Sequence, residues 1–383
     1  MLINKWSGNG TSDISLYNTP YDDMFSFFTA HKECYVWGNG RIGSAILHYL
    51  EQSDMIPAGT VTSDTFDEFR KNYKPGETGV IVGVGEKIYE EIKPKFISFI
   101  NENDIFMLPK EIRENLGYHF SLDMIERDFW LNIFVTNICN LNCKCCSTFA
   151  PICRNQPDYY IPEDFKKDLD MFKKSGFERL NVLKFTGGEP FRHKELIELF
   201  RIGREMYPDT TIECYTNGII PSSLDSEMLK EITALDVEFV VTEYPLGSLD
   251  LTSFYERADK AGLKYNVIFS ENIKYFSKRP LNFDRGTPKY KFASCPRYKF
   301  CDSLFMFKGK LYKCIYTFAS QYFNKAFGTD LRITKSDYLD LNGISKKDVF
   351  EFCRTRIPFC GYCEPIEETV EWGLSDRDIN EWT

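Results

Sequence analysis

The chain has 383 residues, a formal net charge of −9 at pH 7 and a pI near 5.3, and this balance argues against a nucleic-acid partner because phosphate binding needs a local excess of Lys and Arg. A hydrophobic share of 43% and an aromatic share of 16% are ample for packed cores in two or three domains. Thirteen cysteines, no signal segment at the N-terminus and no apolar stretch of about 18 residues predict reduced thiols in a soluble cytoplasmic protein without a membrane partner.

The N-terminal third predicts a polar leader and then a small α/β domain. Strands are expected at 33–37, 56–62, 79–83 and 105–108, with helices between them. The first strand runs directly into Gly38-Asn-Gly40-Arg-Ile-Gly43, so this βαβαβ unit resembles a half-Rossmann domain. The resemblance implies a phosphate at the helix N-terminus and a ribose-binding carboxylate, for which Asp64 has a suitable position. A structural or partner-docking domain is the alternative, since one half cannot hold a dinucleotide as two halves do.

Cys139, Cys143 and Cys146 are the most informative residues of the chain. Three thiolates at this spacing, in a loop just after a predicted strand, can hold three irons of a 4Fe-4S cubane and leave the fourth iron open. The candidate ligand for that iron is S-adenosylmethionine (SAM), chelating through its amino and carboxylate groups. A zinc site or buried structural thiols are the alternatives for such a triplet on its own.

A second motif, Gly187-Gly188-Glu189-Pro190, closes a predicted strand about forty residues further on. Glycines let the backbone come close to a ligand, and a neighbouring carboxylate can accept hydrogen bonds from an ammonium group. The two motifs, in this order and at this separation, resemble the radical SAM superfamily. The resemblance implies one-electron transfer from a reduced cluster, cleavage of SAM to methionine, and a 5′-deoxyadenosyl radical that takes a hydrogen atom from the substrate.

The chain departs from the superfamily at one position. An aromatic residue near the adenine usually precedes the third cysteine, whereas this chain has Cys145. Cys145 is also an alternative cluster ligand, although its use would break the spacing of the motif.

Strands and helices alternate from about residue 129 to residue 269, which predicts parallel strands with ligand sites at their carboxyl ends. Strands are expected at 130–135, 180–185, 211–215, 237–242 and 265–269, and helices at 162–175, 194–207, 223–235 and 251–262. The partial (β/α)6 TIM-type barrel of the superfamily fits this pattern. Thr216 and Asn217 resemble the segment that meets the ribose of SAM, with a plain Asn-Gly turn as the alternative. Glu243 and Tyr244 are further pocket candidates.

A second cysteine group occupies the C-terminal third and consists of Cys295, Cys314, Cys360 and Cys363. Gly309, followed by four residues and Cys314, resembles the SPASM and twitch extensions, in which a β-hairpin and a short helix carry auxiliary clusters. A full SPASM set needs cysteines beyond Cys363, so the resemblance implies the shorter twitch form with one auxiliary 4Fe-4S cluster. A zinc ribbon is the alternative. Cys34, Cys153 and Cys214 are expected to be structural. Cys301 and Cys353 are expected to be small buried hydrophobic residues, with a substitute ligand or a hydrogen-atom donor as the alternatives.

The predicted fold is therefore α/β, with a partial (β/α)6 TIM-type barrel preceded by a small Rossmann-like βαβαβ domain and followed by a small twitch Fe-S domain. The expected boundaries are a leader (1–30), a Rossmann-like domain (31–120), a radical SAM barrel (124–285), a twitch domain (286–370) and a C-terminal tail (371–383).

The expected activity is oxidation or epimerisation of a sugar or nucleotide-linked sugar, in surface-polysaccharide or natural-product biosynthesis, with flavodoxin or ferredoxin as the reductant. An auxiliary cluster with all its sites filled can accept an electron from a substrate radical or return one. The alternatives are a maturase that modifies a ribosomal peptide, and an Fe-S electron-transfer or scaffold protein that does not cleave SAM. Lys184, Arg192, His193 and Tyr215 lie near the motifs in the sequence, but none of them is assigned as a general base.

Overall fold

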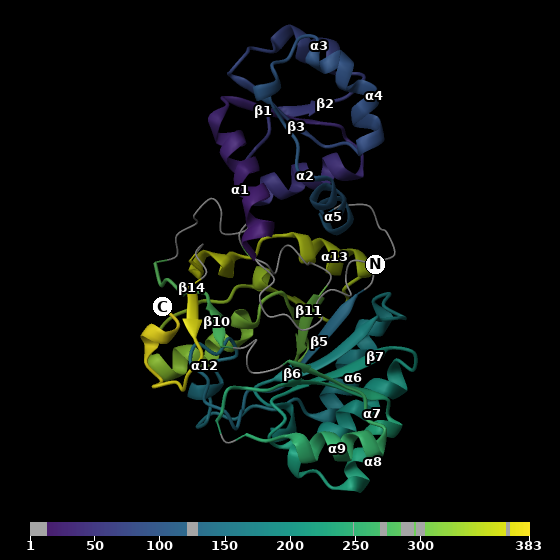
Figure 1. The fold of residues 1–383 in the computed structure, drawn as a ribbon, viewed down its shortest axis with the longest axis vertical. Coiled ribbons are helices and arrows are strands. Elements are labelled where there is room, and N and C mark those ends of the chain that lie inside the picture. Colours follow the sequence, from purple (N-terminus) through teal and green to yellow (C-terminus); the bar gives the residue numbers. More distant parts are fainter. Residues whose placement is uncertain are drawn as a thin grey trace.

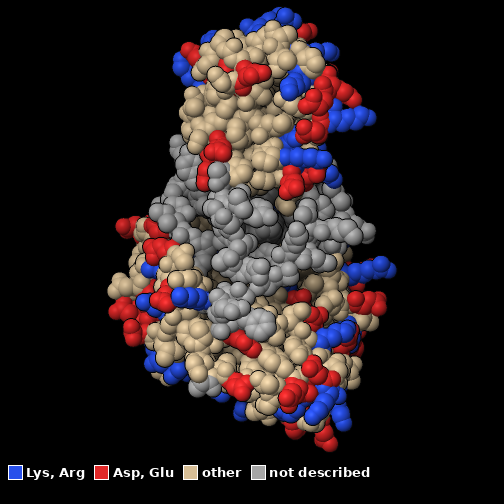
Figure 2. Space-filling view, in the orientation of Figure 1, with Lys and Arg blue, Asp and Glu red and all other residues tan. Residues whose placement is uncertain are grey.

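The computed structural model describes residues 14–120, 129–247, 249–268, 274–284, 295, 303–364 and 368–383. Figure 1 shows a small upper unit, formed by α1 to α5, on a larger lower body. In the part of the chain that is described, no helix is long and apolar enough to cross a membrane. On the face shown in Figure 2, Lys and Arg are interspersed with Asp and Glu over the described surface.

The upper unit is built on a parallel four-stranded sheet with strand order β2-β1-β3-β4. The strands are β1 (Glu33–Trp37), β2 (Gly59–Val61), β3 (Thr78–Val82) and β4 (Ile105–Phe106). The helices are α1 (Ile14–Ala30), α2 (Arg41–Gln52), α3 (Phe66–Asn72), α4 (Glu86–Ile97) and α5 (Lys110–Phe120). This order places β1 beside β3, as in flavodoxin-like sheets, whereas a dinucleotide-binding half has its first three strands in the order 3-2-1.

Helix α1 includes much of the segment expected to be a leader. The rings of Tyr21 and Phe25 pack against Tyr49 of α2, with ring centroids 5.1 and 6.1 Å apart. Both side chains are buried because the apolar face of this amphipathic helix packs against α2. The part of the expected leader around Tyr21 and Phe25 therefore packs against the upper unit.

The lower body contains an eight-stranded sheet with strand order β13-β12-β11-β5-β6-β7-β8-β9. Its strands are β5 (Trp130–Thr136), β6 (Val182–Gly187), β7 (Thr211–Thr216), β8 (Val237–Thr242), β9 (Tyr265–Ile268), β11 (Ser303–Phe307), β12 (Lys310–Tyr312) and β13 (Tyr338–Asp340). The run from β11 to β9 is parallel, and β12 and β13 are antiparallel additions. The predicted α/β class is confirmed, and a sixth parallel strand, β11, lies on the far side of β5.

The two faces of this sheet differ in polarity. Helices α6 (Pro162–Lys174), α7 (Leu196–Met206), α8 (Ser226–Ala234) and α9 (Thr252–Ala261) lie on one side, at the lower right of Figure 1. Leu183 and Phe185 of β6 are fully buried, while Lys184 between them is only partly buried. Because side chains alternate along a strand, the helix-covered face is apolar and the opposite face carries polar groups.

A tight hairpin joins β11 to β12. Phe307 pairs with Lys310 across a two-residue loop, and both loop residues, Lys308 and Gly309, have positive φ, 47° and 77°. Two left-handed residues define a type I′ turn, whose twist matches that of the strands. The hairpin leads through Cys314 into helix α12 (Ile315–Phe327), and helix α13 (Lys346–Arg354) follows β13.

Polar contacts join the upper unit to the lower body at the end of α13. The guanidinium of Arg356 donates to both carboxylate oxygens of Asp54 at 2.6 and 2.8 Å, and its backbone N–H donates to Oε1 of Gln52 at 2.8 Å. His48 Nε2 donates to the carbonyl of Arg354 at 3.1 Å. This last bond fixes the tautomer of His48, because a carbonyl can only accept.

Candidate functional site

The three motif cysteines lie together in the loop that follows β5. Burial raises the pKa of the Cys139 thiol, and Cys146 and Cys143 raise it further, so the three sulfurs act on one another. Burial and Cys146 likewise raise the pKa of Cys143, to about 12. Among the described residues no three His, Cys, Asp or Glu side chains converge tightly enough to hold a single metal ion. A cubane takes one thiolate on each iron and so keeps its ligands further apart.

Cys145 lies apart from this triad. Its φ of 57° is left-handed, and its side chain is buried. Burial raises its pKa, and the charged groups that act on it are Lys278, Glu381, Lys144 and Glu368, with no cysteine among them. The charged groups that act on Cys145 therefore differ from those that act on Cys139 and Cys143.

The two motif glycines let the end of β6 lie directly against the end of β5 and the loop after it, which carries the three motif cysteines and is here called the cluster loop. Gly188 N–H donates to the carbonyl of Thr136 at 2.7 Å, and Glu189 N–H donates to that of Ile138 at 2.8 Å. A Cβ on Gly187 would lie 2.3 Å from the Thr136 oxygen, and one on Gly188 would lie 2.4 Å from the Ile138 oxygen. From the sequence, these glycines are expected to let the backbone come close to a ligand. In the structure, they let the end of β6 come close to the backbone of Thr136 and Ile138.

Glu189 is the centre of a buried junction. Its side chain is 1% exposed and accepts hydrogen bonds from the Thr216 hydroxyl at 2.7 Å and the Asn217 N–H at 2.8 Å. The backbone N–H of Phe191 donates a third, at 3.2 Å. Burial raises the pKa of Glu189 to about 7 although these three bonds lower it, and no cationic side chain among the described residues contributes. A buried carboxylate without a counter-charge is costly, and a ligand cation would relieve that cost.

Thr216 and Asn217 are therefore part of the buried junction around Glu189 and do not form only a turn at the surface. Besides its backbone bond to Glu189, Asn217 donates from its side-chain amide to Oδ1 of Asn140 in the cluster loop at 2.8 Å. Its own Oδ1 accepts from the N–H of Ile219 at 3.1 Å. The carboxyl ends of β5, β6 and β7 are thus tied together at one place, as expected for a parallel sheet.

Tyr244, which follows β8, points toward the same loop. Burial raises its pKa, and Cys143, Cys146 and Cys139 raise it further. Its ring centroid lies 5.9 Å from that of Trp372, which belongs to the C-terminal segment. The neighbouring Glu243 instead accepts a hydrogen bond from Tyr255 at 2.7 Å. Both residues were predicted to line the pocket because they directly follow a parallel strand. That position alone could not show that only Tyr244 lies near the motif cysteines.

The comparison with protein families matches the radical SAM superfamily to residues 133–247, which contain the cysteine triad and the Glu189 junction. Residues 133–247 thus form a radical SAM domain. The 7,8-dihydro-6-hydroxymethylpterin dimethyltransferase of Methanocaldococcus jannaschii is similar to it, with 36% identity over 90 residues, which are 23% of this chain and 17% of that protein. The matched region thus spans under a fifth of that relative.

Two solved structures are similar to parts of the chain at low identity. BtrN in complex with AdoMet and 2-DOIA is 18% identical with a TM-score of 0.42, over 63% of this chain and 94% of BtrN. Native anSMEcpe with bound AdoMet and the Cp18Cys peptide is 17% identical with a TM-score of 0.29, over 37% and 42% of the two chains. Neither likeness is strong enough to define the substrate of this radical SAM protein.

His193 is a structural residue of the radical SAM domain. Its Nε2–H donates to the carbonyl of Tyr160 at 2.9 Å, and its Nδ1 accepts from the N–H of Glu195 at 3.1 Å. Burial lowers its pKa and so favours the neutral ring. With both nitrogens already bonded, His193 is not poised to exchange protons with a substrate.

A polar cluster lies on the open face of the radical SAM sheet. Lys184 donates to the phenol oxygen of Tyr215 at 2.9 Å, and the phenol donates to Glu213 at 3.0 Å. The ammonium of Lys184 also lies 4.2 Å from the ring centroid of Trp130. Glu238 stands opposite Glu213 in register, and burial followed by that charge raises its pKa. The side chains of Lys184 and Glu213 are 14% and 20% exposed, so this cluster is only partly buried.

The structure also brings the second cysteine group together. Burial raises the pKa of Cys363, and the thiols of Cys314, Cys360 and Cys295 raise it further. The guanidinium of Arg279 donates to the sulfur of Cys295 at 3.7 Å. Cys353 is buried in α13, and Cys301 lies outside the described residues.

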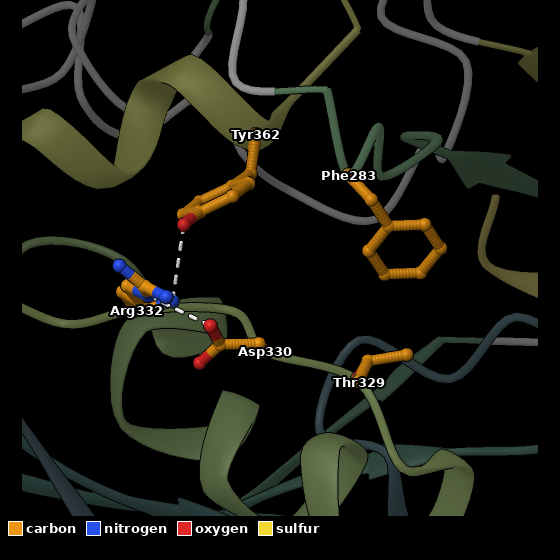
Figure 3. Close-up of a pocket in the computed structure, with 5 residues that line it drawn as sticks. All are labelled: Phe283, Thr329, Asp330, Arg332 and Tyr362. Carbon is orange, nitrogen blue, oxygen red and sulfur yellow. Dashed lines mark hydrogen bonds and ion pairs between the residues drawn. The ribbon is translucent and has the colours of Figure 1, made fainter.

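A hollow of about 480 Å³ adjoins this group. Figure 3 shows its lining, in which Tyr362 and Phe283 face Thr329, Asp330 and Arg332. The backbone N–H of Arg332 donates to the Tyr362 hydroxyl at 3.1 Å, and its guanidinium is paired with Asp330 at 2.7 Å. Since Tyr362 stands between Cys360 and Cys363 in the chain, the hollow is a surface close to the second cysteine group.

In the upper unit, the candidate nucleotide glycines serve two different purposes. A Cβ on Gly43 would lie 2.0 Å from the Gly38 carbonyl, so these two residues are needed for close packing of α2 on the sheet. Gly40 is the N-cap of α2 and faces open space, since a Cβ added to it would meet no described atom within 4 Å. Asp64 is exposed in the turn after β2. Gly40 and Asp64 are therefore exposed, whereas Gly43 is packed against the backbone of Gly38.

Proposed function

We propose that this protein is a radical SAM enzyme with two 4Fe-4S clusters that oxidises or epimerises a sugar or nucleotide-linked sugar. The site cluster would be held by Cys139, Cys143 and Cys146. The auxiliary cluster would be held by Cys295, Cys314, Cys360 and Cys363. The observation that carries the proposal is the junction around Glu189, a buried carboxylate without a counter-charge beside the cysteine triad.

The junction suits the amino group of SAM. An ammonium group beside Glu189 would supply the missing positive charge, and the donors Thr216 and Asn217 hold the carboxylate in place. When bound, the reduced site cluster supplies an electron to SAM and so provides the 5′-deoxyadenosyl radical. The residues of this chain fix where the ligand lies, since Gly187 and Gly188 lock the Glu189 loop to the cluster loop.

The open polar face suits a substrate rich in hydroxyl groups. Glu213 and Glu238 can accept hydrogen bonds from hydroxyls, and Lys184 can donate to a hydroxyl or phosphate oxygen. Lys184 is three residues before Gly187, which places it about 10 Å along the strand from the motif at roughly 3.3 Å per residue. A sugar between this cluster and the strand ends would therefore lie within reach of SAM.

The gathered thiols of the second cysteine group support the auxiliary cluster. Such a cluster would take the electron that remains after hydrogen-atom abstraction in an oxidation, while the proton passes to solvent or to an acceptor on the open face. The upper unit is proposed to bind the nucleotide of a nucleotide-linked sugar, through the open N-terminus of α2 at Gly40 and through Asp64.

The test is anaerobic reconstitution, counting of iron, sulfide and zinc, and measurement of 5′-deoxyadenosine after reduction, with and without nucleotide sugars. About eight irons per chain and cleavage that rises with a sugar nucleotide are expected. About four irons with zinc would overturn the auxiliary cluster, and cleavage stimulated only by a peptide would favour the maturase. Full clusters without cleavage under any condition would favour the electron-transfer role.

A variant of the open face tests the substrate assignment. Lys184→Met is expected to raise KM for the sugar substrate while basal SAM cleavage stays unchanged, because Lys184 lies away from the junction. Lys174→Met is the matched control, since Lys174 is an exposed lysine paired with Asp170 on α6. Equal kinetic effects of the two variants would contradict the role of the open face.

A further inference from the structure

The segment 279–282, here called the flanking segment, runs beside the second cysteine group. It follows β10 (Tyr275–Lys278), which pairs antiparallel with β14 (Glu368–Glu371), and Figure 1 shows these two strands side by side. Leu281 of the flanking segment forms an antiparallel bridge with Cys363. From the sequence, the flanking segment was expected at the end of the radical SAM barrel, without a residue assigned to the second cysteine group.

Backbone hydrogen bonds fix the register of the flanking segment on both sides of Cys363. The N–H of Asn282 donates to the carbonyl of Tyr362 at 2.7 Å. The N–H of Glu364 donates to the carbonyl of Pro280 at 2.9 Å. The chain just before Pro280 is therefore held in a defined position next to the second cysteine group.

Arg279 occupies that position, and its side chain reaches the second cysteine group. The guanidinium donates to the sulfur of Cys295 at 3.7 Å. It also lowers the pKa of Cys363, against the larger effects of burial and of the other three thiols. Because an arginine side chain stays protonated in proteins, Arg279 brings both an N–H donor and a permanent positive charge to this group.

We propose that Arg279 is a positioning residue that donates an N–H···S hydrogen bond to the Cys295 thiolate and raises the reduction potential of the auxiliary cluster. The proposal rests on the proposed function, since it requires a 4Fe-4S cluster on Cys295, Cys314, Cys360 and Cys363. One-electron reduction adds negative charge to a cluster and its thiolates. A fixed cation that donates to a ligand sulfur therefore stabilises the reduced form more than the oxidised form.

A higher potential has a consequence for the type of reaction. In an oxidation, the substrate radical loses one electron to the oxidised auxiliary cluster and one proton to solvent. In an epimerisation, the substrate radical is not oxidised and regains a hydrogen atom. By stabilising the reduced auxiliary cluster, Arg279 favours oxidation of the sugar over its epimerisation.

The first test compares Arg279→Gln, which removes the charge, with Arg279→Lys, which keeps it. Both variants are made in the whole chain and reconstituted with both clusters. Potentiometric titration monitored by electron paramagnetic resonance follows the cluster whose signal does not change when SAM is added. At a fixed solution potential, the ratio of reduced to oxidised auxiliary cluster is expected to fall about tenfold in Arg279→Gln and only about threefold in Arg279→Lys. An unchanged ratio in Arg279→Gln would overturn the proposal.

Lys278→Gln is the matched control, because it removes a cation from the preceding residue. The ammonium of Lys278 lies 2.9 Å from the main-chain oxygen of Thr383 and 3.4 Å from a carboxylate oxygen of Glu368. Its charge is thus paired with groups outside the second cysteine group, and the ratio is expected to stay at the wild-type value. A fall as large as that in Arg279→Gln would reveal a general effect of charge and overturn the role of the hydrogen bond.

A second measurement needs no change of potential. Wild-type protein labelled with ¹⁵N at the arginine guanidinium groups is expected to show a nitrogen hyperfine coupling to the reduced auxiliary cluster, and Arg279→Lys is expected to lack it. A coupling that persists in Arg279→Lys would belong to another arginine and overturn the proposal, as would the absence of any coupling in wild type. This measurement decides the matter if Arg279→Gln does not retain the auxiliary cluster.

The outcomes separate this inference from the proposed function. About eight irons and normal SAM cleavage in Arg279→Gln, together with an unchanged ratio, would overturn only the role of Arg279. Reconstituted wild-type protein with only about four irons per chain would overturn the auxiliary cluster of the proposed function, and the inference would fail with it.

Discussion

Replacing Thr216 by Val removes a hydrogen bond to a buried carboxylate, and the matched change at Thr210 removes a buried hydrogen bond between neutral groups. The losses of stability in the two variants can therefore be compared. The Thr216 hydroxyl donates to Glu189 at 2.7 Å, and both side chains are almost fully buried. Loss of a hydrogen bond to a charged group costs about 1.5–3 kcal/mol. Thr210, at the other end of β7, is equally buried and donates to the carbonyl of Leu180 at 2.8 Å. Because that bond joins neutral groups, Thr210→Val is expected to cost about 0.5–1.5 kcal/mol.

The assay is urea unfolding of the anaerobic protein without clusters, at a pH above the value of about 7 to which burial raises the pKa of Glu189, so that this group is ionised. Equilibrium dialysis of SAM into the reconstituted protein follows. Thr216→Val is expected to lower the free energy of unfolding by about 1–1.5 kcal/mol more than Thr210→Val. It is also expected to weaken SAM binding about tenfold, a change of about 1.4 kcal/mol, because Glu189 loses the shortest of the three hydrogen bonds that position it at the junction. Thr210→Val should leave the affinity for SAM unchanged. Equal losses of stability and affinity in the two variants would refute the junction as the centre of the SAM site.

Three further predictions test other parts of the structure. Cys146→Ala is expected to lose about four irons per chain while Cys145→Ala keeps them, and loss of iron from Cys145→Ala would contradict the separation of that thiol from the triad. Gly188→Ala places a methyl group 2.4 Å from a backbone carbonyl of the cluster loop, so we expect loss of the site cluster by iron analysis and a lower thermal midpoint. The pKa of His48 is lowered by burial and by nearby positive charges, so its contribution to stability is present above the unfolded pKa of about 6.5 and is lost as the pH falls through the folded value. Thermal unfolding between pH 8 and 5.5 should therefore show a steeper loss for wild type than for His48→Gln, and parallel curves would exclude this residue as the cause.

Local patterns were sufficient for much of the fold. The strand at 33–37 and the five parallel strands that begin at Trp130 were predictable because each is an apolar run bounded by turn residues. The pairing of β11 with β5 was not predictable, since no local signal states which distant strand will lie beside an edge. The strand order of the upper unit was missed for the same reason, because βαβ units of either order have the same pattern along the chain.

For the candidate site, too, the sequence predicted some features and missed others. The spacing of the cysteines and the Gly-Gly-Glu-Pro motif pointed to the loops that the structure brings together. The sequence could not show that Glu189 is held by Thr216 and Asn217, since these contacts depend on two neighbouring strands ending at the same level.

The pairing of β11 with β5 also bears on the order in which the chain can fold. During synthesis, β5 emerges early and gains β6 on one side, but its other edge stays unpaired until β11 leaves the ribosome. An unpaired edge strand in a partly folded chain is a template for association with other chains. The radical SAM domain is therefore not a unit that can be cut out at the end of β9, and its nascent form depends on the cysteine-rich C-terminal third to cover the exposed edge.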